Sequence, residues 1–188
     1  FWTEPLAASN VAFSSVGTGS MQVSWVVGVG TGCLVLVKDK AVVDGIPVDG
    51  TVYTANSAFK SGDQIGSGNY AVYSAVGTSV TVTALAPTTT YYVAVYTYAG
   101  NGGFRNYQQD TPATGSQATI SVASTPTLSS PTAPFVSITT TSAVLGATVV
   151  SNGGAALSAR GTVWATTANP TINRLAEGGT STGAYSHT

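Results

Sequence analysis

Residues 79–95 read SVTVTALAPTTTYYVAV, and this stretch decides the fold. Apolar and polar residues alternate on both sides of Pro87, which is typical of two β-strands that each bury one face. The fixed φ and the missing N–H of proline favour a corner between the strands over a continued ladder. The stretch therefore predicts two consecutive strands that turn their apolar faces into one core.

The same stretch resembles the E strand, the following corner and the F strand of fibronectin type III domains. That family's pattern is Leu-x-Pro-x-Thr-x-Tyr-x-Val-x-Val, and the matching positions here are Leu85, Pro87, Thr89, Tyr91, Val93 and Val95. The resemblance implies an immunoglobulin-like β-sandwich in which the Tyr91 hydroxyl binds backbone near the turn and its ring packs in the core. It also implies that Trp25, within a B strand, fills the space between the two sheets.

Alternation of period two continues along the rest of the chain. No segment keeps the i, i+3, i+4, i+7 spacing of an amphipathic helix for three turns, so the sequence predicts an all-β protein. Beyond residues 79–84 and 90–98, strands are predicted at residues 7–13, 21–27, 32–38, 70–74, 116–122, 135–139, 142–150 and 157–166. Their lengths and their Gly, Asn, Asp and Pro borders are typical of a sandwich built from hairpins.

Two domains are expected, residues 1–122 and residues 135–188. Residues 123–134 between them are rich in proline, serine and threonine and are predicted to be a semi-extended linker. The second domain resembles another fibronectin-like repeat through its Asn152-Gly153 turn and its Arg-Gly-x-x-Trp strand, which makes Trp164 an expected structural residue. Few apolar residues follow Trp164, so this second sandwich is expected to be incomplete here and completed by further sequence or another copy.

A long insertion, residues 39–69, separates two of the predicted strands. Its PVDG and YTAN motifs, with GNYAVY and NY…PATG further along, resemble a fibronectin type III variant of large secreted and cell-surface proteins from Bacteroidota-type bacteria. The resemblance implies tandem repeats in a secreted or cell-surface protein whose partners include other domains of one longer chain. We expect the insertion to be ordered, because so long a loop needs contacts of its own. The residues expected to pack it against the sandwich are Ile46, Val48, Tyr53 and Phe59.

Composition argues against several classes of function. Only 7% of the residues are charged and the net charge is −1, so no basic surface is expected for nucleic acid or an anionic membrane. No run of 18 apolar residues is present, and no direct membrane insertion is expected. Cys33 and His187 are each the only residue of their type, which leaves too few groups for a zinc site or an activated nucleophile. The chain is therefore predicted not to be an enzyme.

Two groups of residues are candidates for ligand binding. Loop aromatics could stack on a glycan or anchor a protein, or they could form a small core under the insertion; they are Tyr53, Phe59, Phe104 and Tyr107. Carboxylates in the insertion could offer oxygen ligands to calcium, although Asp-Gly is also an ordinary turn signal; they are Asp44, Asp49 and Asp63. No other cofactor is expected.

These observations favour a non-catalytic structural or adhesive module, a spacer or stalk in a larger exported surface protein. Low charge and an apparent tandem arrangement both suit that function. Two alternatives stay open at this point. One is a glycan- or protein-binding module that uses the loop aromatics, and the other is an accessory domain of an extracellular hydrolase.

Overall fold

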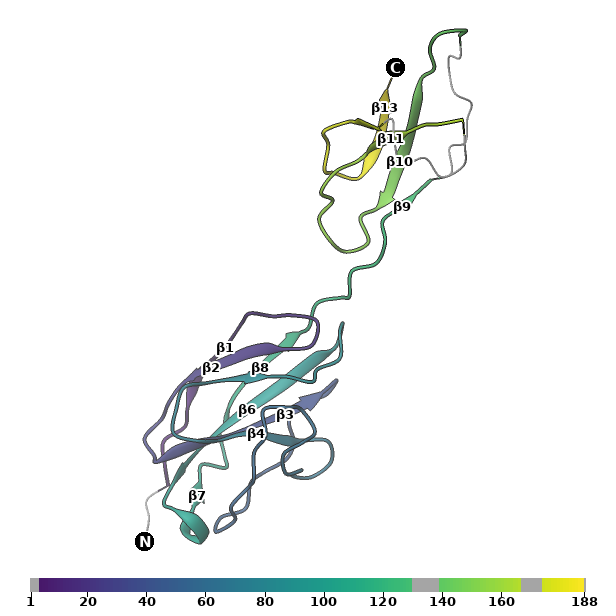
Figure 1. Cartoon of the computed structure of the whole chain (residues 1–188). Coiled ribbons are helices and arrows are strands. Elements are labelled where there is room, and N and C mark those ends of the chain that lie inside the picture. The colour runs from purple at the N-terminus through teal and green to yellow at the C-terminus, as the bar shows by residue number, and fades with distance from the viewer. Residues whose placement is uncertain (1–3, 130–138, 167–173, 188) are drawn as a thin grey trace. The chain divides into compact units, whose positions relative to one another are not determined.

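The computed structural model describes residues 4–129, 139–166 and 174–187, which Figure 1 draws as a coloured ribbon. Within these residues there are strands and one 3-10 turn but no α-helix, so the all-β prediction is confirmed. The chain divides into two compact units, Phe1–Ser121 and Val122–Thr188.

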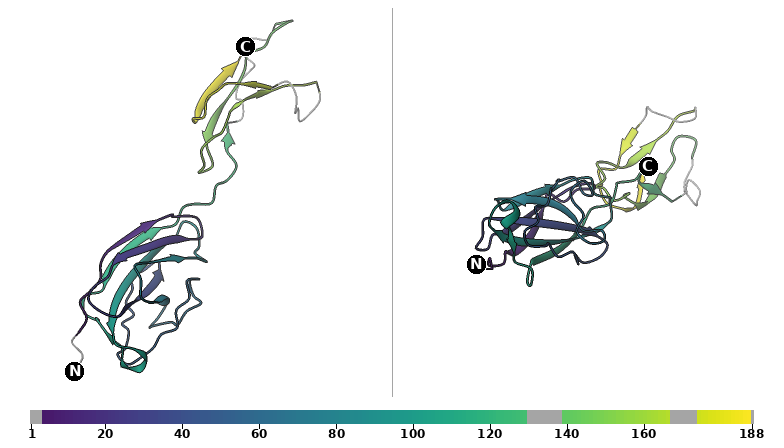
Figure 2. Two further views of the ribbon diagram at one scale, coloured as in Figure 1. Left: turned by 60° about the vertical axis from the view of Figure 1, so that its left-hand side comes forward. Right: turned by 90° about the horizontal axis from the view of Figure 1, so that it is seen from below.

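Unit 1 is an immunoglobulin-like β-sandwich. Its elements are β1 (Ser9–Ser14), β2 (Met21–Val26), β3 (Gly32–Asp39), β4 (Tyr70–Ala75), β5 (Ser79–Val82), β6 (Thr90–Ala99), the 3-10 helix η1 (Gly102–Phe104), β7 (Asn106–Tyr107) and β8 (Ala113–Ala118). One sheet has the order β1-β2-β5 and the other β4-β3-β6-β7, with β8 also paired to β6. The two layers are visible in Figures 1 and 2.

The core lies between these two sheets. Alternate residues of β2 are buried, as the period-two pattern predicts, and Trp25 is 4% exposed. It faces apolar side chains of β3 and β6, and the main core residues are Met21, Val23, Trp25, Cys33, Val35, Val37, Val82, Leu85, Tyr91, Val93 and Val95. The expected burial of Trp25, Leu85 and Tyr91 between the sheets is therefore confirmed.

The tyrosine corner forms as its motif predicts. Tyr91 is 2% exposed, and its hydroxyl accepts a hydrogen bond from the Ala86 backbone N–H at 2.8 Å. Pro87 is exposed in the turn, one residue beyond that donor. The ring thus packs in the core while the hydroxyl fixes the backbone of the corner.

The variant Tyr91→Phe tests this hydrogen bond. It keeps the ring and removes only the acceptor for the Ala86 N–H, so we expect the free energy of unfolding to fall by about 1 kcal/mol. Urea unfolding should show a lower midpoint with an unchanged slope. A variant as stable as the original chain would contradict the structural role given to the hydroxyl.

The last strand of the sandwich lies earlier than predicted. The alternation suggested a strand over residues 116–122, but β8 spans Ala113–Ala118. It pairs with β6 only as far as the start of that strand, where Thr90 faces Ala118. Thr119 then has another function, because its hydroxyl donates to the Ala86 carbonyl at 2.7 Å and so supports the corner.

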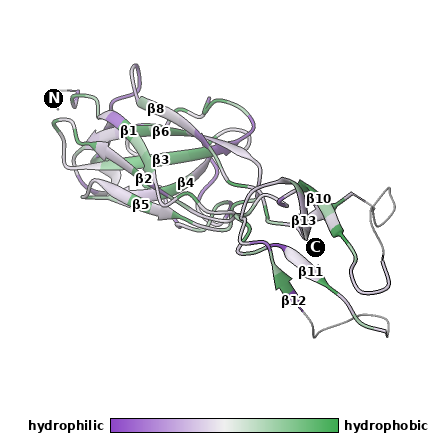
Figure 3. Ribbon diagram, turned by 90° about the horizontal axis from the view of Figure 1, so that it is seen from above, coloured by the Kyte–Doolittle hydropathy of each residue, from purple (hydrophilic) through white to green (hydrophobic). Residues whose placement is uncertain are grey.

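The insertion between β3 and β4 builds a second core on the outer face of the larger sheet. Strand β3 is buried on both faces and is hydrophobic along most of its length (Figure 3). The residues of this second core are Leu34, Leu36, Ile65, Ala71, Ala94, Tyr96, Tyr98 and Tyr107, with Val43, Tyr53 and Ala55 packed against them. The insertion is thus an ordered layer.

The predicted packing residues of the insertion were correct only in part. Phe59 is buried and Tyr53 is partly buried, as expected. Ile46 and Val48, however, are 58% and 60% exposed. Hydrogen bonds rather than these side chains fix that part of the loop, since the Tyr96 hydroxyl donates to the buried carbonyl of Gly45 at 3.0 Å.

Unit 2 contains two small antiparallel sheets. Its strands are β9 (Thr127–Leu128), β10 (Leu145–Ser151), β11 (Gly161–Val163), β12 (Arg174–Ala176) and β13 (Gly183–His187), in the orders β13-β10-β9 and β11-β12. Strand β9 lies within the segment predicted as a linker, and most of the strand expected at residues 135–139 lies outside the described residues.

Trp164 does not fill a core as Trp25 does. It follows the end of β11 and is 46% exposed. Among the described residues of unit 2, Val149 is the one apolar side chain that is fully buried.

Candidate functional site

Phe59 does not present its ring to solvent. It is 6% exposed and packs edge-on against Tyr70 and Tyr91, with ring centroids 5.4 and 5.1 Å apart. The ring therefore belongs to the main core of the sandwich. This corrects its assignment as a ligand-stacking residue, because a ligand would have to displace core contacts to reach it.

Tyr107 and Tyr53 form one aromatic cluster under the insertion. Tyr107 is 1% exposed and lies between Tyr53 and Tyr98, with centroid distances of 5.9 and 5.7 Å. Its hydroxyl donates to the Thr51 carbonyl at 2.9 Å, and the Tyr53 hydroxyl accepts from the Val48 N–H at 2.9 Å. Both rings thus hold the loop in place, so the ligand assignment of Tyr107 is also corrected.

Phe104 is the one exposed ring of the four predicted binding aromatics. It ends the short helix η1 and is 77% exposed. The next residue, Arg105, turns back to the sheet, where its guanidinium lies 4.3 Å from the Tyr98 ring centroid and donates to the Ser74 hydroxyl at 3.0 Å. The structure therefore does not bring the four aromatics together into one binding surface.

The three candidate calcium ligands serve different parts of the insertion. Asp49 accepts the Tyr107 N–H at 2.8 Å, and Asp63 accepts the Thr54 N–H at 2.8 Å. Asp44 pairs with the Lys38 ammonium at 2.6 Å. The hydrogen bonds from Lys38 and Asn69 hold the pKa of the Asp44 carboxyl below its usual value.

These carboxylates do not converge. In the part of the chain that the structure describes, no three His, Cys, Asp or Glu side chains lie close enough to hold a metal ion. Asp49 and Asp63 instead each accept a hydrogen bond from a backbone N–H that is distant in the sequence, 58 and 9 positions away. The prediction that Asp44, Asp49 and Asp63 share a calcium site is thus not supported by their placement.

Asn69 is the polar residue that orders the insertion. It is completely buried and lies just before β4. Its Nδ2 donates to Asp44 Oδ1 and to the Ile65 carbonyl, both at 2.9 Å, and its Oδ1 accepts the Asp44 N–H at 3.2 Å. One amide therefore joins the beginning of the insertion to its end.

Cys33 is buried in β3 among apolar residues of the main core. It is 1% exposed, and burial raises the pKa of its thiol, so the sulfur stays protonated at neutral pH. A cavity of about 90 Å³ next to it is lined by Thr97 and by glycines of the β2–β3 loop. The thiol thus lacks both the exposure and the ionisation that reactive cysteines have.

We expect Cys33 to resist bulky thiol reagents while unit 1 is folded. Reaction needs a thiolate and access, and burial removes both. The labelling rate with an aromatic disulfide reagent should therefore follow the opening of unit 1 and rise steeply through the urea transition. Rapid labelling without denaturant would contradict this prediction.

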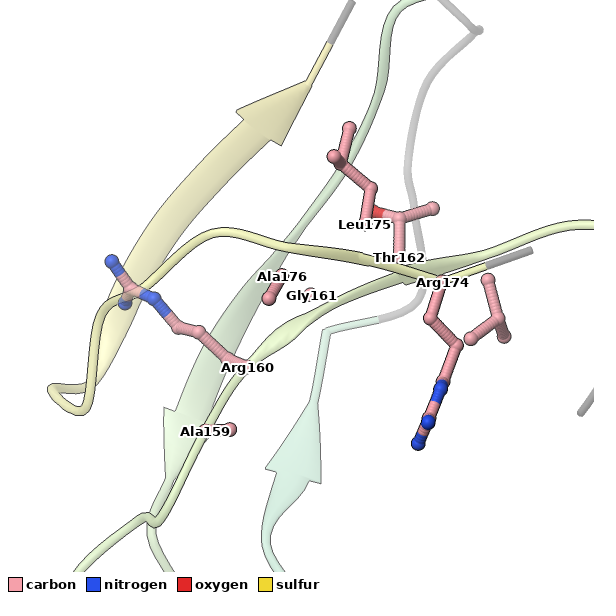
Figure 4. Close-up of a pocket in the computed structure, with 8 residues that line it drawn as sticks. Ala159, Arg160, Gly161, Thr162, Arg174, Leu175 and Ala176 are labelled. Atoms are coloured by element: carbon pink, nitrogen blue, oxygen red, sulfur yellow. The ribbon is translucent and has the colours of Figure 1, made fainter. Parts of the chain in front are cut away.

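A pocket with a volume of about 460 Å³ lies in unit 2. It is lined by β11, β12 and the two residues before β11, Ala159 and Arg160, and Figure 4 shows Arg160 and Arg174 pointing in different directions. Arg160 is already bound on two sides by Glu177, with Nε–Oε2 at 2.6 Å and Nη2–Oε1 at 3.0 Å. The hydrogen bonds to Glu177 raise the pKa of Arg160. The Glu177 carboxylate also neutralises the positive charge that an anionic ligand would need.

Comparison with known proteins does not assign this chain to a family. No family model and no curated protein matches the sequence. A redesigned β-sandwich protein is 19% identical with a TM-score of 0.42, and the match covers 66% of this chain and 97% of that one. A fibronectin type III domain of human collagen XX is 16% identical with a TM-score of 0.38, covering 62% and 95%. The fold assignment rests on strand order and core packing, to which these likenesses add nothing.

The described residues contain no helix of sufficient length and apolar character to cross a membrane.

Proposed function

We propose that this chain is a non-catalytic structural module, a spacer or stalk within a larger exported surface protein. The observation that carries the proposal is that polar side chains of the insertion are hydrogen-bonded to the protein's own backbone. Asp49, Asp63 and Asn69 each bind backbone groups of the fold, and the Cys33 thiol is buried and protonated. Side chains that are hydrogen-bonded to the backbone or buried in the core stabilise the sandwich, and they are poorly placed to act on a substrate.

Other features support an exported, multidomain setting. The chain forms two compact units, and its surface has few charged groups, since only 7% of its residues are charged. It has one cysteine, so the fold does not depend on an intrachain disulfide. The proposed partners are accordingly other domains of the same longer protein, outside the cell or at its surface.

A spacer must keep its length under tension. Stretching the chain between handles attached to its two ends should therefore give a discrete rupture for unit 1. Full extension of that unit would add roughly 400 Å of contour length, less its folded length. Smooth lengthening at low force, without a rupture, would overturn the spacer function.

One observation favours a second candidate, binding of a glycan or protein. Phe104 is 77% exposed at the tip of a loop on a rigid sheet, a position from which rings often contact ligands. Glycan and protein arrays probed with the chain and with Phe104→Ala separate the two functions. Under the spacer proposal neither form retains a ligand. A ligand bound by the original chain and lost in Phe104→Ala would select the binding function instead.

A further inference from the structure

The pair Asn-Gly occurs twice in the sequence, at residues 101–102 and at residues 152–153. An asparagine carboxamide can react with the backbone nitrogen of the residue that follows it. Glycine leaves that nitrogen the least obstructed, because it has no side chain. Both pairs therefore carry the groups for a covalent change of the chain, but their surroundings in the structure differ.

The first pair lies in an open turn of unit 1, between β6 and η1 and just before β7 (Figure 1). Asn101 is exposed, and its side chain makes no hydrogen bond to the short helix that it precedes. A Cβ on Gly102 would find no atom within 4 Å beyond the neighbouring residues. The Asn101 side chain and the Gly102 peptide unit therefore have the space to turn toward each other.

The backbone is held on both sides of this pair. A Cβ at Gly100 would clash with the Phe104 carbonyl oxygen, so the two segments are closely packed there. The Arg105 carbonyl accepts the Gly50 N–H at 2.7 Å, which fixes the far end of the turn. A reaction at Asn101 therefore does not require β6 to separate from β7.

The second pair lies in a turn of unit 2 whose polar groups are hydrogen-bonded. Asn152 Oδ1 accepts the Gly154 N–H at 3.1 Å, and the Gly153 N–H donates to the Ser151 hydroxyl at 3.1 Å. The Gly153 carbonyl also accepts the Ser124 N–H at 2.7 Å. Both reacting groups are thus held in place, so this turn must open before they can meet.

We propose that Asn101 is a site of spontaneous deamidation in the folded protein and that Asn152 is protected from the same reaction. The Gly102 nitrogen loses its proton to water or hydroxide and attacks Cγ of Asn101. A bond forms between that nitrogen and Cγ, the bond from Cγ to Nδ2 breaks, and ammonia leaves with a proton from the solvent. Water then opens the resulting succinimide ring at one of its two carbonyls, which yields aspartate or isoaspartate.

Either product adds a negative charge to the turn, and isoaspartate also adds one backbone atom before Phe104. The Phe104 ring is 77% exposed, and residues 101–104 are all exposed and contribute nothing to either core. The reaction therefore changes the charge and the shape of the surface around this ring and leaves the sandwich intact. It depends only on this turn, and not on whether the chain is a spacer.

The test is incubation of the full chain at mildly alkaline pH, with and without urea, followed by peptide mapping with mass spectrometry. In the folded chain we expect Asn101 to convert about tenfold faster than Asn152, which must first lose two hydrogen bonds. In urea both sites are unfolded Asn-Gly pairs, so their rates should become similar. Equal rates in the folded chain would overturn the proposal, and so would an Asn101 that reacts only in urea.

Three variants check that the reaction proceeds through the Gly102 nitrogen. Asn101→Gln keeps a neutral amide but would have to close a larger ring, so conversion at position 101 should be lost. Gly102→Ala hinders the attacking nitrogen and should slow conversion of Asn101 several-fold. Gly103→Ala is the matched control, because its Cβ would come no nearer than 3.7 Å to the Gly50 carbonyl oxygen and the reacting pair is unchanged. Conversion in Gly102→Ala as fast as in this control would contradict the proposed reaction.

Discussion

Replacing Trp25 by alanine is expected to lower the free energy of unfolding of unit 1 by about 3 to 5 kcal/mol. The side chain is 4% exposed, and its ring meets Tyr73 edge-on with a centroid distance of 5.2 Å. It lies between the two sheets, where β-strands on both sides limit how far the neighbours can move into the space left behind. Most of the lost contact area would therefore remain as a cavity.

Native-state amide exchange at Val35 and Val95 measures this change without using tryptophan fluorescence, which the variant alters. Val76→Ala provides the control, because Val76 is 82% exposed and its truncation should change stability by less than about 0.5 kcal/mol. A loss of stability in Trp25→Ala no larger than that in the control would mean that the sheets do not pack around this ring.

Local motifs explain which parts of the fold could be predicted. The positions of Leu85 and Tyr91 are set within a few residues of a proline turn, so a short sequence pattern fixes both burial and the corner hydrogen bond. The boundary of β8, in contrast, could not be predicted from a local motif. It depends on where β6, more than twenty residues earlier, begins to offer partners, and no local pattern contains that information.

The burial of residues in the insertion also could not be predicted from local sequence. Its residues follow no period, so hydrophobicity alone could not tell that Val43 and Ile65 pack on the sheet while Ile46 faces solvent. Hydrogen bonds from Asn69 decide this orientation, and they join positions 25 residues apart.

The candidate site was predictable only as a set of alternatives. Sequence identified loop aromatics, and it offered both a ligand surface and a small core as explanations. In the structure Tyr107 is buried in a core and Phe104 is exposed on the surface, although the two residues are close in the sequence. The deciding factor is pairing, because Tyr107 belongs to β7 beside β6 whereas Phe104 lies in the turn before it.

Replacing Phe59 by alanine is expected to lower the free energy of unfolding of unit 1 by about 3 kcal/mol or more. The ring is 6% exposed and contacts Tyr70 and the corner residue Tyr91, so its removal opens the side of the sandwich between β4 and β5. So large an effect from a residue in a loop is expected only if the insertion is an integral part of the core.

Phe104→Ala is the matched control for this prediction, since it makes the same change at a ring that is 77% exposed. Its effect on stability should be within about 0.5 kcal/mol. Urea unfolding of both variants, followed at the amides of β3 and β6, gives the comparison. Equal stability of the two variants would show that the insertion does not contribute Phe59 to the core.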